Sequence, residues 1–386
     1  MLDNADAVHE ADESAPLDAD ERSRLDALRS RCPVAHEDGS YVALSHAAVV
    51  AIALDAHTFS SAHPTRRAIP NSLDGAEHTA YREVIDQFLT PERVAAQEPQ
   101  CREVARTLVA SLPRDVTVTA IASLGVPFAV RTQSAWLGWP TSLEASLVTW
   151  MADNHAATRS GDRARTSDVA QRFDAMIHDL MDARRGRPAT DVTGEVMEAT
   201  VDGVPLTDEE IVSVLRNWTA GDLGSIAASI GVIVHMLAER PAVQRDVRAL
   251  VEAGDQAAVA ASVEEMLRID DPFITNRRTA TADHAVEGVT VPAGSTVMLN
   301  WTAANRDPEV FGNPDAYDPA GNAHANLVFG AGAHVCPGRD LTLMELRVVV
   351  EELLAGTAWI EHAEDDQAHR ETPPVGGWAR VPVMLR

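Results

Sequence analysis

The longest helical pattern in the chain runs over residues 208–239 and is apolar around much of its circumference. It follows Thr207-Asp-Glu-Glu210, in which a threonine and a glutamate three residues later have the spacing of a capping box. A helix that is apolar on most sides must be covered by other elements, so we expect it to run through the centre of the fold. Residues 95–236 favour helix after helix, which supplies that cover. The pattern predicts a mainly α protein with minor β structure.

Smaller elements are expected before and after the central helix. Acidic residues 1–24 predict a flexible N-terminal tail. Alternation around Pro292-Ala-Gly294 predicts a hairpin over residues 286–299, and residues 305–326 predict an irregular meander. The remaining patterns predict a strand at 41–44, a turn at 201–205 and helices at 47–54, 77–88, from Pro91, at 256–269 and at 337–354.

The composition narrows the possible functions. The 386 residues are 45% hydrophobic and 23% charged, so the chain can bury a substantial core. The net charge of −26 argues against nucleic-acid binding and against adhesion to an anionic membrane. All 32 basic residues are arginine, which excludes Schiff-base chemistry by a lysine.

The three cysteines, Cys32, Cys101 and Cys336, are too few and too scattered for a disulfide framework. The acidic start does not have the basic and apolar pattern of a secretory signal. The longest near-apolar stretch, residues 225–237, is too short to span a bilayer. We therefore expect a soluble cytoplasmic protein.

The segment from Phe329 to Gly338, F-G-A-G-A-H-V-C-P-G, is the most informative in the chain. Its three glycines indicate a tightly turned backbone close to something flat or bulky. It leads into the predicted helix at 337–354, whose free N–H groups would stabilise a thiolate of Cys336. Such a thiolate in apolar surroundings is what an axial haem ligand requires, and His334 can reach an anionic group of the same cofactor. The alternative is that Cys336 is a small buried apolar side chain.

This segment resembles the haem-binding loop of the cytochrome P450 family, F-G-x-G-x-H-x-C-x-G, and the resemblance extends over residues 32–386. It implies the cytochrome P450 fold, with a single domain at 25–386. It also implies iron protoporphyrin IX (haem b) between the long central helix and the helix after the Cys loop. Cys336 would be the metal ligand, with Phe329, Gly330 and Gly338 in the cofactor-binding loop.

Other segments match family residues that bind the haem propionates. His78-Thr-Ala-Tyr-Arg82 resembles the H-x-x-x-R helix, whose i, i+4 spacing puts both side chains on one face. Arg278 aligns with a propionate-binding arginine, and His334 has the same implied role. The alternative for these four residues is an ordinary surface charge. Glu265-Met-Leu-Arg268 resembles the E-x-x-R helix and is expected to be a structural ion pair.

Two positions depart from the family pattern. Gly321 stands where the meander usually has an arginine, so the ion-pair network around E-x-x-R should be thinner or rebuilt. The central helix reads Ala220-Gly-Asp-Leu-Gly-Ser225 where the family has A-G-x-[Asp/Glu]-Thr, so Leu223 replaces the acid and Gly224 replaces the alcohol.

Asp222 and Ser225 flank this motif, each displaced by one residue or about 100° of helix rotation. We take Gly221, Asp222, Gly224 and Ser225 as catalytic candidates. We expect an ordered water beside the two glycines, with Asp222 or Ser225 relaying protons through it. The alternative for Asp222 is a solvated or paired structural acid.

The resemblance implies a bacterial haem-thiolate monooxygenase, an oxidoreductase that inserts one oxygen atom from O2 into a small, mostly apolar organic substrate. Hydroxylation and oxidative dealkylation both stay open. The missing acid–alcohol pair motivates a second hypothesis, a peroxide-driven peroxygenase or peroxidase. A non-catalytic haem-binding sensor is the third.

The sequences of the central helix, the Cys loop and Pro374-Val-Gly-Gly-Trp378 resemble those of the haem domains of the thiocarbamate-degrading and phthalate-reductase-fused branch. No reductase follows residue 386, so we expect electrons from a ferredoxin or flavodoxin-type donor with its reductase. Because the chain is acidic overall, an acidic donor protein can dock only where basic residues are clustered. We expect such a basic patch at Arg339, Arg102 and Arg106.

Overall fold

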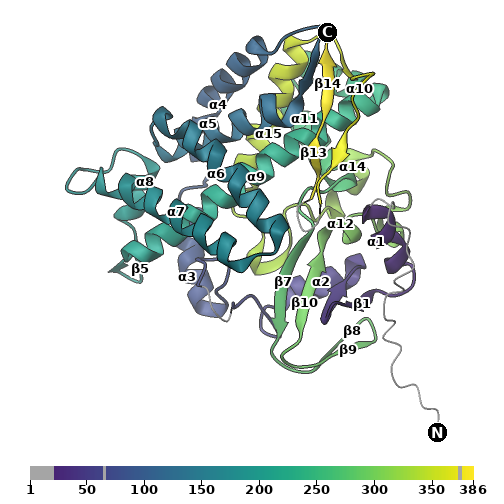
Figure 1. The fold of residues 1–386 in the computed structure, drawn as a ribbon. Helices are drawn as coiled ribbons and strands as arrows, with labels where there is room; N and C mark the ends of the chain where they lie inside the picture. Colours follow the sequence, from purple (N-terminus) through teal and green to yellow (C-terminus); the bar gives the residue numbers. More distant parts are fainter. Residues whose placement is uncertain (1–20, 64–66, 373–375) are drawn as a thin grey trace.

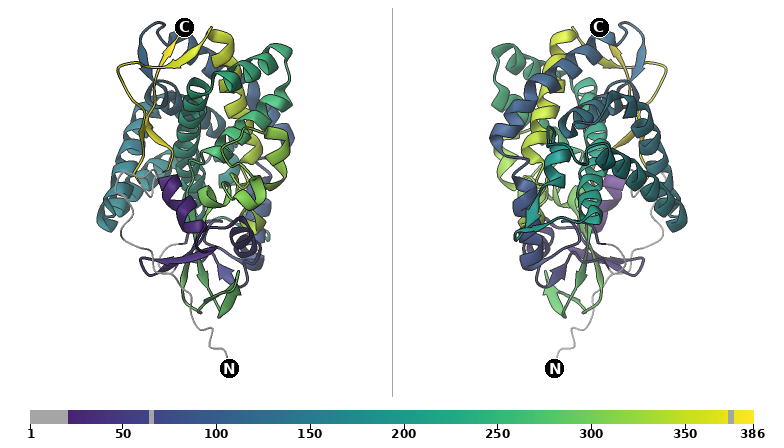
Figure 2. Two further views of the ribbon diagram at one scale, coloured as in Figure 1. Left: turned by 90° about the vertical axis from the view of Figure 1, so that its right-hand side faces the viewer. Right: turned by 90° about the vertical axis from the view of Figure 1, so that its left-hand side faces the viewer.

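The computed structural model of the protein describes residues 21–63, 67–372 and 376–386. Most of these residues form helices around the long helix α9 (Asp208–Glu239) (Figure 1). Figure 2 shows the largest β-sheet gathered at one end of the helical body, with the C-terminus near the other end. The predicted fold class, mainly α with minor β, is confirmed.

The helices are α1 (Glu21–Arg29), α2 (His46–Leu54), α3 (Gly75–Asp86), α4 (Pro91–Ser111), α5 (Val126–Leu137), α6 (Glu144–Ser160), α7 (Arg163–Asp182), α8 (Val192–Met197), α9, α10 (Pro241–Ala253), α11 (Gln256–Ile269), α12 (Trp301–Ala304), α13 (Pro308–Phe311), α14 (Pro319–Asn322) and α15 (Arg339–Gly356). The strands are β1 (Val34–Glu37), β2 (Ser40–Ala43), β3 (Phe59–Ser60), β4 (Thr117–Thr119), β5 (Thr200–Val201), β6 (Val204–Pro205), β7 (Thr275–Ala280), β8 (His284–Val286), β9 (Val289–Val291), β10 (Thr296–Asn300), β11 (Ile360–His362), β12 (His369–Arg370), β13 (Trp378–Arg380) and β14 (Pro382–Leu385).

Helix α9 is the central helix that the sequence predicts. Its capping box is formed, because the Glu210 N–H donates to Thr207 Oγ1 at 3.3 Å and the Thr207 N–H donates to Glu210 Oε2 at 2.9 Å. Helices α5, α7, α10, α11 and α15 all contact it. Its length and hydropathy would also suit a membrane span, but 61% of its most apolar stretch is buried inside the protein. That burial is expected of a core helix.

The five-stranded sheet has the order β1-β2-β10-β7-β3, in which only β2 and β10 are parallel. The predicted hairpin over residues 286–299 is wrong in its pairing. Strand β8 pairs with β9 across Glu287-Gly288, whereas β10 pairs with β7 and β2. The turn at Pro292-Ala-Gly294 reverses the chain but does not choose its partner, because burial of Val297 and Leu299 in the larger sheet decides the pairing.

The predicted tail of residues 1–24 falls mostly outside the described residues, and its last four residues correct the prediction. Helix α1 already begins at Glu21, and its Leu25 and Leu28 are buried. Arg24 holds the start of this helix through hydrogen bonds to Glu21 and Glu37. Strand β4 is a second correction, since it lies in a region predicted as helix and pairs with β14 from the end of the chain.

The Glu265–Arg268 pair holds the core under the meander. Arg268 is fully buried and donates to both carboxylate oxygens of Glu265, at 2.7 and 2.9 Å. Gly321 offers no side chain at the position of the family's arginine. Asn322, its neighbour, donates from Nδ2 to Glu265 Oε1 at 2.7 Å. The network is therefore rebuilt around a neutral amide.

Candidate active site

The loop before α15 packs against the end of α2 and carries Cys336 close to the start of α15. The Cys336 N–H donates to Phe329 O at 2.9 Å, which closes the loop. Gly330 and Gly332 both have a φ of 74°, in the left-handed region that favours glycine. A Cβ on Gly332 would lie 2.2 Å from Ala53 O at the end of α2. The glycines predict a bulky neighbour close to the loop. For Gly332 this neighbour is the backbone of α2.

The surroundings of the Cys336 thiol pull its pKa in two directions. Burial raises the pKa above its usual value, and a hydrogen bond from the Gly338 backbone lowers it. Gly338 is the residue before α15, so this donor belongs to the helix N-terminus that the sequence predicts. A metal ion at the sulfur would remove the thiol proton outright.

A cluster of basic side chains gathers beside this loop. The rings of His78 and His334 lie 4.2 Å apart, and His334 Nε2 lies 3.0 Å from Ser61 Oγ. Burial lowers the pKa of both histidines, to about 4 for His334. The buried His78 Nε2 has no hydrogen-bond partner among the described residues. Asp74, 3.6 Å from His334, is the acid near this pair.

Arg278 on β7 belongs to the same cluster. It is only 6% exposed, and burial lowers the pKa of its guanidinium. Its hydrogen bond goes to the Arg277 carbonyl at 2.9 Å, and no acid of the described chain forms an ion pair with it. A buried guanidinium without a contacting acid is unfavourable unless an anion binds there. The cluster is therefore suited to ligand carboxylates.

Arg82 has a different position from the other three. It lies one turn after His78 on α3, as predicted, and donates to the carbonyls of Ala333 and Val335 at 3.2 and 2.9 Å. Its Nε also donates to Asp86 at 3.2 Å. Arg82 therefore fixes the Cys loop to α3, and these bonds use much of its donor capacity.

The middle of α9 has a short exposed stretch. Ala220 and Gly221 are exposed within a helix that is otherwise mostly buried. A Cβ on Gly221 would meet nothing within 4 Å, so open space lies beside it. The Ser225 hydroxyl donates within the helix, to Gly221 O at 2.6 Å and Asp222 O at 3.2 Å. This bonding ties up the proton that Ser225 is predicted to relay.

Asp222 interacts with another buried acid, Glu345 of α15. Burial raises the pKa of Asp222 to about 7, and burial together with the Asp222 charge raises the pKa of Glu345. Asp222 Oδ2 and Glu345 Oε2 are both buried without a hydrogen-bond partner in the described part of the chain. The alternative stated for Asp222, a structural acid, fits this position between α9 and α15 better than a direct role beside Gly221.

His155 on α6 is a candidate that sequence reasoning missed. A Cβ built on Gly224 would lie 3.5 Å from His155 Nε2, so the imidazole faces the position where the family has an alcohol. Burial lowers the pKa of His155, Arg159 adds to this effect and Glu371 opposes it. No motif surrounds this histidine. The sequence offers only an indirect indication of its role: a glycine at the alcohol position leaves room for a side chain from another helix.

Comparisons with known proteins identify the family. The family model described as Cytochrome P450 matches residues 139–382. Erythromycin C-12 hydroxylase of Saccharopolyspora erythraea is 31% identical over 393 residues, covering 97% of this chain and 95% of its own. This chain belongs to the cytochrome P450 family. Nocardicin C N-oxygenase of Nocardia uniformis subsp. tsuyamanensis is also 31% identical, over 88% of this P450 and 86% of its own chain.

A solved structure agrees with this membership. The histidine-tagged, open cytochrome P450 EryK from S. erythraea matches this P450 with a TM-score of 0.86 at 28% identity, covering 94% of this chain and 95% of that chain. The P450 family uses haem b and O2, so this protein is a haem-dependent monooxygenase, and P450 monooxygenases use an electron-transfer partner. The finer resemblance to the thiocarbamate-degrading and reductase-fused branch is not supported by these relatives.

The residues present fit haem. The cluster around Arg278 offers cationic and neutral nitrogen donors to two propionates, and His78 Nε2 is an unpaired buried atom within it. Cys336 offers a sulfur ligand near the start of α15. Cys336 lies within the glycine-rich loop Phe329–Gly338, and the basic side chains around Arg278 lie beside it.

The three arginines predicted to form a basic patch for an electron donor all have acidic partners. Arg339 donates to both oxygens of Glu264, at 2.8 and 2.9 Å. Arg102 pairs with three acids at once, and Arg106 pairs with Glu103. The acidic residues of α4, α11 and α15 that surround these arginines offset their charge.

Proposed function

We propose that Cys336 is the axial ligand of the haem iron. The observation that carries this assignment is a partly buried thiol that accepts a hydrogen bond from the Gly338 N–H and lies beside the basic side chains around Arg278, where Asp74 is the acid nearby. Phe329 and Gly330 shape the loop, and Gly338 supplies the N–H that favours a thiolate.

Arg278, His78 and His334 hold the propionates in this proposal. Arg278 contributes a permanent charge, because a guanidinium stays protonated even when burial lowers its pKa. The imidazoles are neutral near pH 7 and donate one hydrogen bond each. Arg82 supports this arrangement without contacting the propionates, because it donates to the loop carbonyls of Ala333 and Val335.

The bound haem supplies oxygen activation and oxygen-atom transfer to the substrate. The protein must deliver protons to the open space beside Gly221 while limiting the access of bulk water. His155 Nε2 is placed for this delivery, opposite Gly224. Because its pKa is lowered, the imidazole is neutral at pH 7 and can take a proton from solvent and pass it on through a water.

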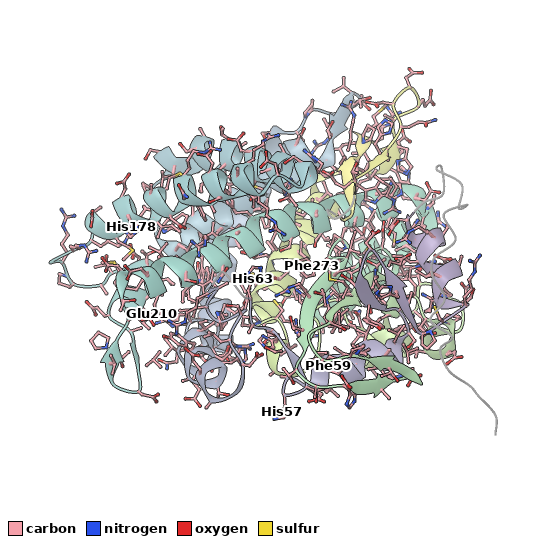
Figure 3. The ribbon with its side chains drawn as sticks, turned by 60° about the horizontal axis from the view of Figure 1, so that its bottom comes forward. His57, Phe59, His63, His178, Glu210 and Phe273 are labelled. Carbon is pink, nitrogen blue, oxygen red and sulfur yellow. The ribbon has the colours of Figure 1, made fainter. Side chains whose placement is uncertain are left out.

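The substrate is a small, mostly apolar organic molecule. The exposed Ala220 and Gly221 of α9 support this class, as does Phe273 after α11, which is 49% exposed (Figure 3). The relatives are named for hydroxylating an erythromycin and for N-oxygenating nocardicin C. Hydroxylation is the reaction that we favour.

Electrons come from a ferredoxin or flavodoxin-type protein with its reductase, and the enzyme acts in the cytoplasm. A peroxide-driven reaction is the second candidate, and the observation that favours it is the absence of an alcohol at Gly224. The experiment that separates the two is turnover with the reduced donor and O2 against turnover with hydrogen peroxide alone. A monooxygenase requires the donor, and product formed only with peroxide would refute it.

A further inference from the structure

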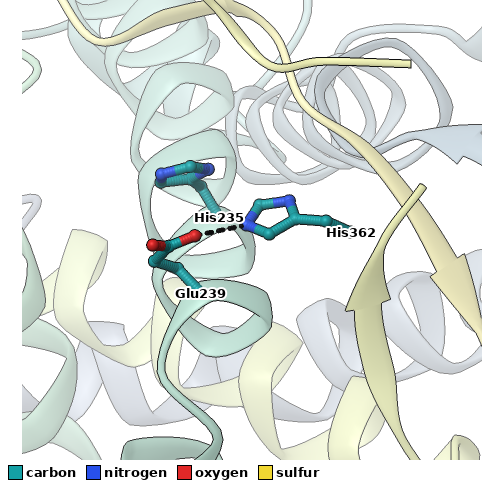
Figure 4. Close-up of side chains that lie close together, drawn as sticks. All are labelled: His235, Glu239 and His362. Atoms are coloured by element: carbon teal, nitrogen blue, oxygen red, sulfur yellow. Dashed lines mark ion pairs between the residues drawn. The ribbon is translucent and has the colours of Figure 1, made fainter. Parts of the chain in front are cut away.

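Three potential metal ligands meet at the end of α9 that is far from the Gly221 stretch in sequence. His235 and Glu239 lie one turn apart on α9, and His362 ends β11. Figure 4 shows the three side chains converging, with Glu239 Oε2 3.1 Å from His362 Nε2. One nitrogen or oxygen of each residue lies within 4.8 Å of the others.

The donor atoms suit a divalent transition metal. Two imidazoles and one carboxylate form a ligand set that zinc uses in sites with an open fourth position. His235 Nδ1 is buried and has no hydrogen-bond partner in the described part of the chain. His362 Nε2 likewise accepts no bond of good geometry there, although it lies within ion-pair distance of Glu239. The lone pairs are therefore not committed to other groups.

The spacing requires only a small contraction. Ligand atoms at about 2.1 Å from a tetrahedral zinc lie about 3.4 Å from one another. Glu239 is 60% exposed at its side chain and His362 30%, so both can rotate inward. The same exposure leaves a side open for a water as the fourth ligand.

The neighbouring charges are largely balanced. Trp378 packs against the His235 ring, with ring centroids 3.9 Å apart and the planes tilted by 38°, and donates its Nε1–H to Asp270 at 2.9 Å. Asp270 also holds Arg370 and Arg22, which are the nearby cations. Asp270 therefore offsets positive charge on the far side of Trp378 from His235.

We propose that His235, Glu239 and His362 bind one divalent transition-metal ion of the zinc class, separate from the haem. The ion would join α9 to β11, and through β11 to the three-stranded sheet β11-β14-β4, in which β11 and β14 come from the end of the chain. Trp378, packed on His235, extends this tie to β13. The site is thus a structural clamp between the central helix and the C-terminal strands.

The test uses haem-loaded protein treated with a chelator, dialysed and titrated with Zn2+ alone. Bound zinc is measured by competition with a chromophoric chelator, and thermal unfolding is recorded with and without zinc. We expect one site in the wild type and a rise in its midpoint temperature with zinc. Glu239→Gln and His362→Gln should each weaken zinc binding by at least about tenfold and abolish the rise.

His178→Gln is the matched control, because His178 is an exposed histidine on α7 far from the cluster in sequence (Figure 3). It should bind zinc as the wild type does. Equal zinc binding by all four proteins, or none by the wild type, would overturn the proposal. A midpoint lowered equally with and without zinc in Glu239→Gln would also overturn it, since the pair would then be an ordinary ion pair.

Discussion

The Cys336 loop and the middle of α9, the two sides of the proposed active site, are built in different ways. The loop works mainly through backbone, with glycines at φ of 74°, a close approach to α2 and N–H groups near the sulfur. The middle of α9 works through side chains that arrive from separate helices, with His155 of α6 facing Gly224. A short motif can encode the first arrangement, whereas the second depends on packing between elements distant in sequence.

Cys336→His should produce the largest effect, because it removes the proposed ligand from a loop shaped around sulfur. Activity should fall by at least about a hundredfold. The reduced wild type with carbon monoxide should show the absorption band typical of thiolate ligation, and the variant should lose it. A variant that keeps the band would refute the role of Cys336, while loss of all haem would call for Cys336→Ser as the second test.

His155→Ala should affect the α9 side alone. We expect product formed per NAD(P)H oxidised to fall by roughly tenfold, with more peroxide released and the carbon monoxide spectrum unchanged. Gly224→Ser in the same background should restore part of the coupling, since the one atom within 4 Å of a Cβ at this position is His155 Nε2, and His155→Ala removes it. If His155→Ala couples as well as the wild type, protons arrive by another route.

Asp222→Asn should change the pH dependence of stability. The pKa of Asp222 rises from 3.8 to about 7 on folding, so its stabilisation is complete below about pH 4 and is lost as the pH rises towards 7. Relative to the variant, the wild type should lose up to about 4 kcal/mol of unfolding free energy over this range. Glu345 and Cys336 are the titratable groups that interact with Asp222.

The measurement is chemical unfolding of both proteins at several pH values, with Glu345→Gln as the companion variant. That variant should flatten the dependence, because the raised pKa of Glu345 itself contributes to the loss of stability as the pH rises. A difference between wild type and Asp222→Asn that is constant from pH 4 to 8 would contradict the assignment.

Ser225→Ala should have the smallest effect. The hydroxyl is bonded to helix carbonyls, so stability should change by about 1 kcal/mol or less and coupling should stay near the wild-type value. Coupling is measured as for His155→Ala. A large loss would show that Ser225 leaves its helix bonds during turnover and would restore the relay predicted from the sequence.

Local patterns account for much of what the sequence predicted correctly. The bounds of α9 and α11 follow from a capping box, apolar periodicity and flanking turn residues, all contained in one segment. Strand β4 and the pairing of β10 could not be predicted in this way. Their partners come from the far end of the chain or from the middle of a sheet, where burial outweighs local preference.

The sequence alone determined the Cys336 loop that we propose binds the haem, because its proposed chemistry depends on residue types within ten positions: glycines for the turns, a cysteine as candidate metal ligand and a helix start after it. Only the tertiary structure decided what the other side chains do. It pairs Asp222 with Glu345, closes Ser225 onto its own helix, offsets the charge of Arg339 and brings His155 opposite Gly224. The physical reason is that burial and the charge of a neighbour fix protonation and hydrogen bonding, and both are set by distances between helices that no local pattern records.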